Sequence, residues 1–228
     1  MKLSIKLLLA MISIFLVLIV LNAFSLKRKW EKIDKNDHYT DFKKLSNMPF
    51  KYLKVSTVEG MIGKVNISKS QNFQIHVSPF WSDRVITKIL KDTLYVEFLK
   101  DSKGKTHEFD DYEKVVVIEC PEVGQIETNN VTVVIDSLNQ KALSLFGKGY
   151  GSFESKSLTI SDIILVLRDN SSCNFHPQKQ LKLTSLDADL SPKSYLNMRA
   201  VFPQKIKMVN GPETGLEMNG ATLKLLGK

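Results

Sequence analysis

The longest apolar segment of the chain lies close to the N-terminus. The twenty residues from Leu7 to Leu26 include no charged side chain. As an α-helix this segment is about 30 Å long, which matches the hydrocarbon core of a bilayer. Residues 7–26 are therefore predicted to form a transmembrane helix or uncleaved signal anchor, after a short tail of residues 1–6. A cleaved signal peptide is the alternative, because two lysines precede the segment and Ala23-Phe24-Ser25 has the small residues of a cleavage site.

A different pattern begins after Pro49, where apolar and polar residues alternate in short runs. Alternation with period two is typical of strands that bury one face. Polar turns or turns with Gly and Pro separate the runs, which are Phe50–Val55, Lys64–Ile67, Phe73–Val77, Thr93–Phe98, Val115–Glu119 and Val131–Ile135. Residues 49–228 are therefore predicted to form one all-β domain.

The C-terminal part of the chain repeats a triplet in which two apolar residues flank a polar one. The triplet recurs at irregular intervals, at Leu143–Leu145, Leu158–Ile160, Leu181–Leu183, Ile206–Met208 and Leu223–Leu225. Coils of two or three short strands would bury their alternate residues only against neighbouring coils. We therefore predict a β-solenoid-like stack of short strands. A β-sandwich is the alternative, because a strict period is the usual sign of a solenoid.

Composition and cysteine content limit the class of protein. Apolar residues make up 43% of the chain and charged residues 25%, which excludes a polytopic membrane protein and a disordered chain. Cys120 and Cys173 are too few for a disulfide-rich scaffold. They pair only if stacking brings their Cα atoms within about 7 Å, and two buried free thiols are expected.

Part of the net charge of +8 lies directly after the apolar segment. Residues 27–48 are predicted to form a basic juxtamembrane stalk, whose contacts with anionic lipid headgroups come from Lys27, Arg28, Lys29, Lys32 and Lys35. No nucleic-acid-binding motif accompanies these cations, so no nucleic-acid partner is expected. By the positive-inside rule they favour a cytoplasmic β domain, as in a membrane-tethered regulator.

Five segments of the β region share an apolar pattern, namely Phe50–Val55, Gly63–Ile67, Phe73–Val77, Asp92–Val96 and Val117–Pro121. Together they resemble the opening of the GIN-domain family of bacterial envelope proteins, also described as auto-transporter adhesin head domains. Leu143–Phe153 is similar to the family's repeat of apolar residues and glycines, whereas Ser185, Asp187 and Asn210 stand where glycine is usual. The resemblance covers residues 50–228. It implies a β-solenoid-like domain on the periplasmic or external side, and it carries over no catalytic residue.

Two groups of residues have the composition of a binding site. Gly147–Gly151 has the glycine density of a phosphate-binding loop, but a strand-like segment follows it instead of a helix, so glycines at a coil corner are expected. The four histidines lie far apart and match no zinc motif, and His76 is expected to be exposed on a strand. No cofactor or metal is predicted.

Asp187 and Asp189 are the closely spaced acidic pair that suggests catalysis. They are two residues apart on a predicted strand, so both carboxylates project from one face, about 6–7 Å apart. Such a pair suits a glycosidase or a calcium ion. The residues between and beside them, Leu186, Ala188 and Leu190, form an apolar face, so the solvated outer side of a strand is the simpler interpretation.

These observations favour a non-enzymatic, membrane-anchored envelope protein with a role related to adhesion. Its β domain would bind an unknown glycan or protein, and its N-terminal helix would bind membrane lipid. The alternative is a β-helical carbohydrate-active enzyme that uses Asp187 and Asp189, which requires further converging acids.

Overall fold

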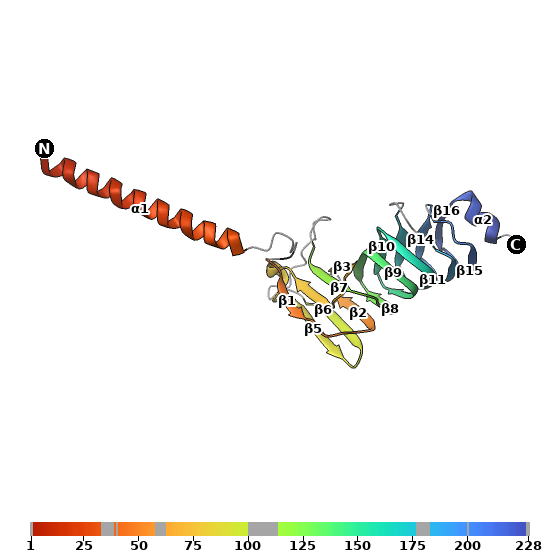
Figure 1. Ribbon diagram of the computed structural model, residues 1–228. Coiled ribbons are helices and arrows are strands. Elements are labelled where there is room, and N and C mark those ends of the chain that lie inside the picture. The colour runs from red at the N-terminus through yellow and green to blue at the C-terminus, as the bar shows by residue number, and fades with distance from the viewer. Residues whose placement is uncertain are drawn as a thin grey trace. The chain divides into compact units, whose positions relative to one another are not determined.

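The computed structural model describes residues 2–32, 39, 41–57, 63–99, 114–176, 183–199 and 201–226. The chain divides into two compact units, Met1–Asp41 and Phe42–Lys228. Helix α1 (Lys2–Lys32) belongs to the first unit, and all the described strands belong to the second (Figure 1).

Helix α1 extends beyond the predicted residues 7–26 at both ends. Lys, Arg and Glu are strong helix formers, so the charged residues beside the apolar run continue the helix. Lys27 and Glu31 are one turn apart, with 3.9 Å between Nζ and Oε1. Within the described residues, the helix over Met11–Glu31 is the one segment long and apolar enough to cross a membrane, and none of it is buried. It is suited to be a membrane anchor or a signal peptide.

The second unit is built mainly of strands, which confirms the all-β prediction. A turn of 3-10 helix, η1 (Pro79–Trp81), and the short helix α2 (Gly220–Leu226) are its other regular elements in the described ranges. The strands are β1 (Lys43–Ser46), β2 (Tyr52–Thr57), β3 (Gly63–Lys69), β4 (Gln74–Val77), β5 (Val85–Leu90), β6 (Thr93–Phe98), β7 (Val116–Cys120), β8 (Gln125–Asn129), β9 (Val131–Lys148), β10 (Ser152–Ser155), β11 (Leu158–Leu167), β12 (Ser172–Phe175), β13 (Ser185–Leu190), β14 (Tyr195–Met198), β15 (Lys205–Asn210) and β16 (Gly215–Met218).

Most of these strands lie in two parallel rows that share the long strand β9. Row A contains β7, β3, the first part of β9, β10, β12, β14 and β16. Row B contains β6, β2, β8, the second part of β9, β11, β13 and β15. From β9 onward the chain alternates between the rows, and we call one row A strand with the following row B strand a rung. The rungs lie side by side in Figure 1.

Successive rungs are offset by a nearly constant number of residues. Ser152 lies opposite both Thr132 and Ser172, at a spacing of twenty residues in each case. Tyr195 follows its partner Ser172 by 23 residues, because the connection between β12 and β13 is longer, and Gly215 follows Tyr195 by twenty. Since side chains alternate along a strand, this register stacks equivalent residues of neighbouring rungs above one another.

The N-terminal end of the sheet has a different pairing. Strand β4 pairs antiparallel with β1 and β7, and β5 pairs antiparallel with β6. The sheet is therefore mixed, and it is not closed, because in the described residues β1, β5, β15 and β16 each pair on one side only. Strand β1 lies within the predicted stalk of residues 27–48, so the β unit begins several residues before Pro49.

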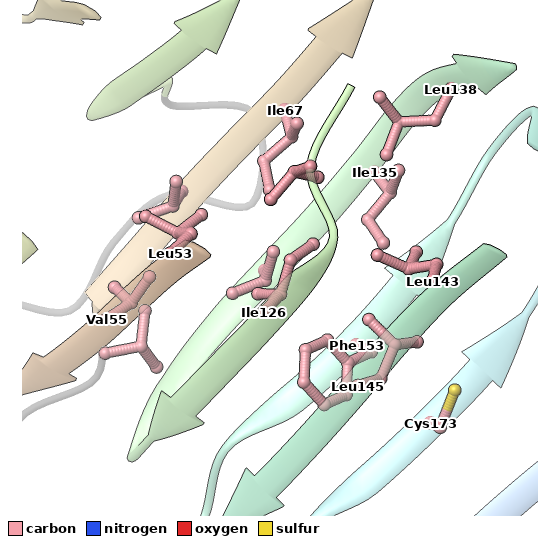
Figure 2. Packing of buried hydrophobic residues seen from close by; sticks show 14 of the residues in the cluster. Leu53, Val55, Ile67, Ile126, Ile135, Leu138, Leu143, Leu145, Phe153 and Cys173 are labelled. Atoms are coloured by element: carbon pink, nitrogen blue, oxygen red, sulfur yellow. The ribbon is translucent and has the colours of Figure 1, made fainter. Parts of the chain in front are cut away.

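One continuous cluster of buried apolar side chains runs through the second unit. In row A the register stacks Val133, Phe153 and Cys173 in one column. Leu143 and Leu145 of row B belong to the same cluster, and Figure 2 shows both close to Phe153. The apolar core is less well covered at its C-terminal end. There the side chains of the last strands are only partly buried, namely Ile206, Met208, Leu216 and Met218.

Candidate functional site

The burial pattern of β13 confirms the predicted placement of Asp187 and Asp189 on an outer face. Leu186, Ala188 and Leu190 alternate with them and are buried in the core. The side chains of Asp187 and Asp189 are about half exposed, at 53% and 46%. The sequence pattern therefore located this strand and its two faces correctly.

Both aspartates form ion pairs with cations that lie on a neighbouring strand or directly after one. The Arg168 guanidinium binds the Asp189 carboxylate with both terminal nitrogens, with 3.0 Å between Nη1 and Oδ1. This hydrogen bond lowers the pKa of Asp189 and raises that of Arg168. Lys207 Nζ lies 3.6 Å from Asp187 Oδ2. A carboxylate held in its ionised form by a guanidinium is a poor general acid, so this geometry does not favour a glycosidase.

Other acids on the outer faces are also bound by neighbours. The Oγ of Ser185 donates to Asp162 Oδ1 of the adjacent strand at 2.5 Å. The further ion pairs between strands or their ends are Lys54–Glu127 at 2.7 Å, Lys156–Asp136 at 2.9 Å and Arg199–Glu217 at 2.9 Å. These charges connect one strand to the next, and they explain much of the polar outer surface without a ligand.

Gly147–Gly151 forms a corner between rungs, as the sequence predicts. Gly149 has a φ of +62°, and a Cβ at this position would lie 2.2 Å from Asn130 Oδ1. That oxygen accepts a hydrogen bond from the backbone N–H of Tyr150 at 2.9 Å. Strand β10 follows the corner, so the loop lacks the helix N-terminus that a phosphate-binding loop requires.

The prediction of an exposed His76 is wrong. Its side chain is almost fully buried, and Nε2 lies 3.3 Å from Oε2 of Glu119. The register places it beside Val117 on β7, and Val117 beside Asn66 on β3, and both of these are buried too. At this end of row A both faces of the strands are covered, so alternation along β4 alone did not indicate exposure.

Of the other three histidines, the structure describes one. His176 is exposed after β12, whereas His38 and His107 lie outside the described residues. In the ranges that the structure describes, no group of three His, Cys, Asp or Glu side chains is arranged to hold a metal ion.

The two cysteines are buried free thiols, as expected. Cys120 lies on β7 and Cys173 on β12, with β3, β9 and β10 between these strands. Four strand spacings correspond to about 19 Å, far beyond the Cα separation of a disulfide. Burial raises the pKa of Cys120 to about 12 and raises that of Cys173 as well, so neither is a reactive nucleophile.

The cations predicted to contact lipid headgroups lie at the C-terminal end of α1. Lys27, Arg28 and Lys29 are exposed, Lys32 is the last residue of the helix, and Lys35 lies outside the described residues. The helix therefore carries a cluster of positive charge directly after its apolar stretch, where a bilayer surface would lie if the helix spans a membrane. The lipid contact itself stays a prediction.

No protein-family model matches the chain, and no curated protein sequence matches it. Solved structures are similar in fold. A "putative adhesin" from Bacteroides fragilis has a TM-score of 0.53 at 15% sequence identity, over 78% of this chain and 92% of the other. Two further proteins described in the same words, from Parabacteroides merdae and Parabacteroides distasonis, each have a TM-score of 0.44 at 13% identity. They cover 78% of this chain and 91% and 92% of their own. The first of these likenesses shows that the fold is shared with an adhesin-like protein.

Proposed function

We propose that this protein is a non-enzymatic, adhesion-related protein of the cell envelope, held in the membrane by α1. The observation that supports it most is the fold shared with the Bacteroides fragilis "putative adhesin" over nearly the whole of that chain. A fold alone does not define a function. The apolar helix before the β unit adds independent support, because it fits a protein that is exported or anchored at a membrane.

The β unit is proposed to be a short β-solenoid of the kind found in the GIN-domain family. Its support is the parallel register of rows A and B, with about twenty residues per rung. Each rung contacts only its neighbours, which is the principle of a solenoid. The mixed pairing at the N-terminal end would then be a cap that blocks addition of further strands.

The β unit is proposed to lie outside the cytoplasmic membrane, although the cations after α1 favour the opposite orientation. Protease added to osmotically opened cells tests this directly. We expect degradation of residues 42–228. Full protection of this unit, with only the N-terminal end accessible, would place it in the cytoplasm.

The adhesion proposal is tested with bacterial cells that display either the full chain or residues 1–41 alone. Both forms keep the anchor, so only the β unit differs between them. Under flow over immobilised mucin, cells with the full chain should be retained longer. Equal retention on mucin, on extracellular-matrix proteins and on cultured epithelial cells would contradict the proposal.

A further inference from the structure

A pocket at the N-terminal end of the β unit has a composition unlike that of the charged outer faces. It lies between the end of β1 and the turn that joins β3 to β4, with a volume of about 350 Å³. Its lining consists of Asn47, Pro49, Gln71, Asn72, Phe73 and Gln74. Four of these six residues carry a side-chain amide, and none carries a charge.

Strand pairing brings the two sides of the pocket together. Strands β1 and β4 are antiparallel, with Ser46 opposite Ile75. The residues that follow β1 therefore lie beside those that precede and begin β4, although more than twenty residues separate them in the sequence. The position of the pocket is thus set by the sheet and not by a single loop.

The aromatic ring in the pocket is held in place by the core. Phe73 is half-buried, and its ring meets that of Phe50 edge to face, with 5.1 Å between centroids. Phe50 itself is buried in the apolar cluster. One edge-to-face partner fixes the orientation of the Phe73 ring while part of its surface stays accessible.

The four amides have hydrogen-bonding capacity that the described part of the protein does not use. Each offers two N–H donors and one carbonyl acceptor. The side chains of Asn47, Gln71, Asn72 and Gln74 make no hydrogen bond within the described residues, whereas acids of the outer faces such as Asp189 and Glu217 are paired with cations. Donors and acceptors therefore face the same small space as an apolar ring.

We propose that this pocket binds one unit of a neutral carbohydrate. Sugar hydroxyls both donate and accept, as amides do, and the apolar C–H face of a pyranose fits against an aromatic ring. An anionic ligand would find no cation in the lining, and a fully apolar ligand would leave the amides unpaired. The volume falls in the range of small-molecule sites. This inference rests on the proposed adhesion function and names its ligand class.

The test uses the full chain in phospholipid nanodiscs, because detergents with sugar headgroups would compete. The probes are the methyl glycosides of glucose, galactose, mannose, fucose, N-acetylglucosamine and N-acetylgalactosamine at millimolar concentration, followed by saturation-transfer NMR. We expect transfer to at least one neutral glycoside and little to methyl glucuronide. No transfer to any neutral glycoside, or stronger transfer to the glucuronide, would overturn the proposal.

Two variants locate the binding. The double change Gln71→Ala with Asn72→Ala removes two exposed amides and should weaken binding at least tenfold. Phe73→Leu keeps an apolar contact with Phe50 but removes the ring, and it should weaken binding as well. The matched control, Asn139→Ala with Asn174→Ala, removes two amides elsewhere on the β unit and should bind as the unchanged protein does. Equal binding by all three variants would place the sugar site elsewhere.

Adhesion under flow separates this inference from the function on which it rests. If the Gln71→Ala, Asn72→Ala variant is still retained under flow and still binds sugar, the proposal of a sugar site in this pocket is contradicted. The adhesion proposal is not affected by that result. Loss of both in this variant alone supports the two proposals together. If the full chain is not retained on any surface, adhesion fails, while NMR binding that depends on the pocket still supports a sugar site.

Discussion

Five residues at the corners of the rungs adopt the left-handed backbone conformation. They are Asn130, Gly149, Asp169, Lys193 and Glu213, with φ between 58° and 64°. Gly, Asn and Asp tolerate this region well, whereas a left-handed Lys or Glu costs about 1–2 kcal/mol. The corner geometry is thus repeated at each rung, but only three of the five residues are suited to it.

Replacing Lys193 by Asn should therefore stabilise the protein. The side chain of Lys193 is exposed, and Asn relieves part of the strain, so we expect the free energy of unfolding to rise by about 0.5 kcal/mol. Urea unfolding measures the difference. Lys141→Asn, at an exposed position within β9 that has no left-handed backbone, is the control and should not stabilise. A loss of stability in Lys193→Asn would show that the corner is not strained.

The buried thiols should be inert in the folded protein. We expect iodoacetamide at pH 8 to leave Cys120 and Cys173 unmodified and to alkylate both in urea, as measured by mass spectrometry. Because folding raises both pKa values, their contribution to stability is complete below about pH 8.5 and is lost as the pH rises towards 12. Rapid alkylation of either thiol in native buffer would contradict this burial.

Residue types indicated some of these positions and not others. Gly149 was predicted at a corner because glycine is the usual residue for a positive φ. Lys193 and Glu213 have no such signal, since their conformation is imposed by the stacked rungs. The amides of the pocket were also missed, because only the pairing of β1 with β4 brings Asn47 to Gln74.

At the scale of the strand, the ion pairs of β13 should contribute little to stability. Exposed pairs are typically worth less than about 1 kcal/mol, so the change Asp187→Asn with Asp189→Asn should lower the free energy of unfolding by no more than this. Leu186→Ala on the same strand should cost about 2–5 kcal/mol, because it opens a cavity in the core. Chemical denaturation compares the two variants.

The pH dependence of the Asp189 pair has a defined sign. Its pKa is lowered in the folded state, so its contribution is present above the ordinary pKa of about 4 and is lost as the pH falls through the lowered value. The part of the stability difference between the double amide and the unchanged protein that comes from the Asp189 pair should therefore shrink as the pH falls below about 4. A glycan-cleaving activity lost in the double amide would instead establish the enzyme alternative.

The positions of the strands were easier to predict than which strands of successive rungs lie opposite one another. Six predicted runs agree with β2, β3, β4, β6, β7 and the first part of β9, whereas β1, β5 and β8 were not predicted. The apolar triplets were matched wrongly: Leu143 and Leu145 correspond to Ile163 and Leu165, and not to Leu158 and Ile160. Leu223–Leu225 lies in α2. A triplet marks buried alternation, but only hydrogen-bonded register shows which triplets are neighbours.

At the scale of the whole molecule, the N-terminal helix should keep the protein in the membrane. High salt screens Lys27, Arg28 and Lys29 but does not weaken burial of an apolar helix, so we expect retention after salt and alkaline washing. Immunoblotting of the membrane pellet measures this. Release of the protein, or an N-terminus mapped to Leu26, would identify the segment as a cleaved signal peptide.

The twenty-residue offset between rungs has a mechanical consequence. Force applied to the C-terminal end should detach α2 first and then one rung at a time, because each rung is held only by the adjacent ones. Each rung that detaches frees about twenty residues, or about 70 Å of extended chain. Stretching of single molecules should thus show a series of short, equal extensions, and a single long one would mean that the rungs yield together. A chain that lengthens in small steps spreads a sudden load over time, which would suit the adhesion role proposed above.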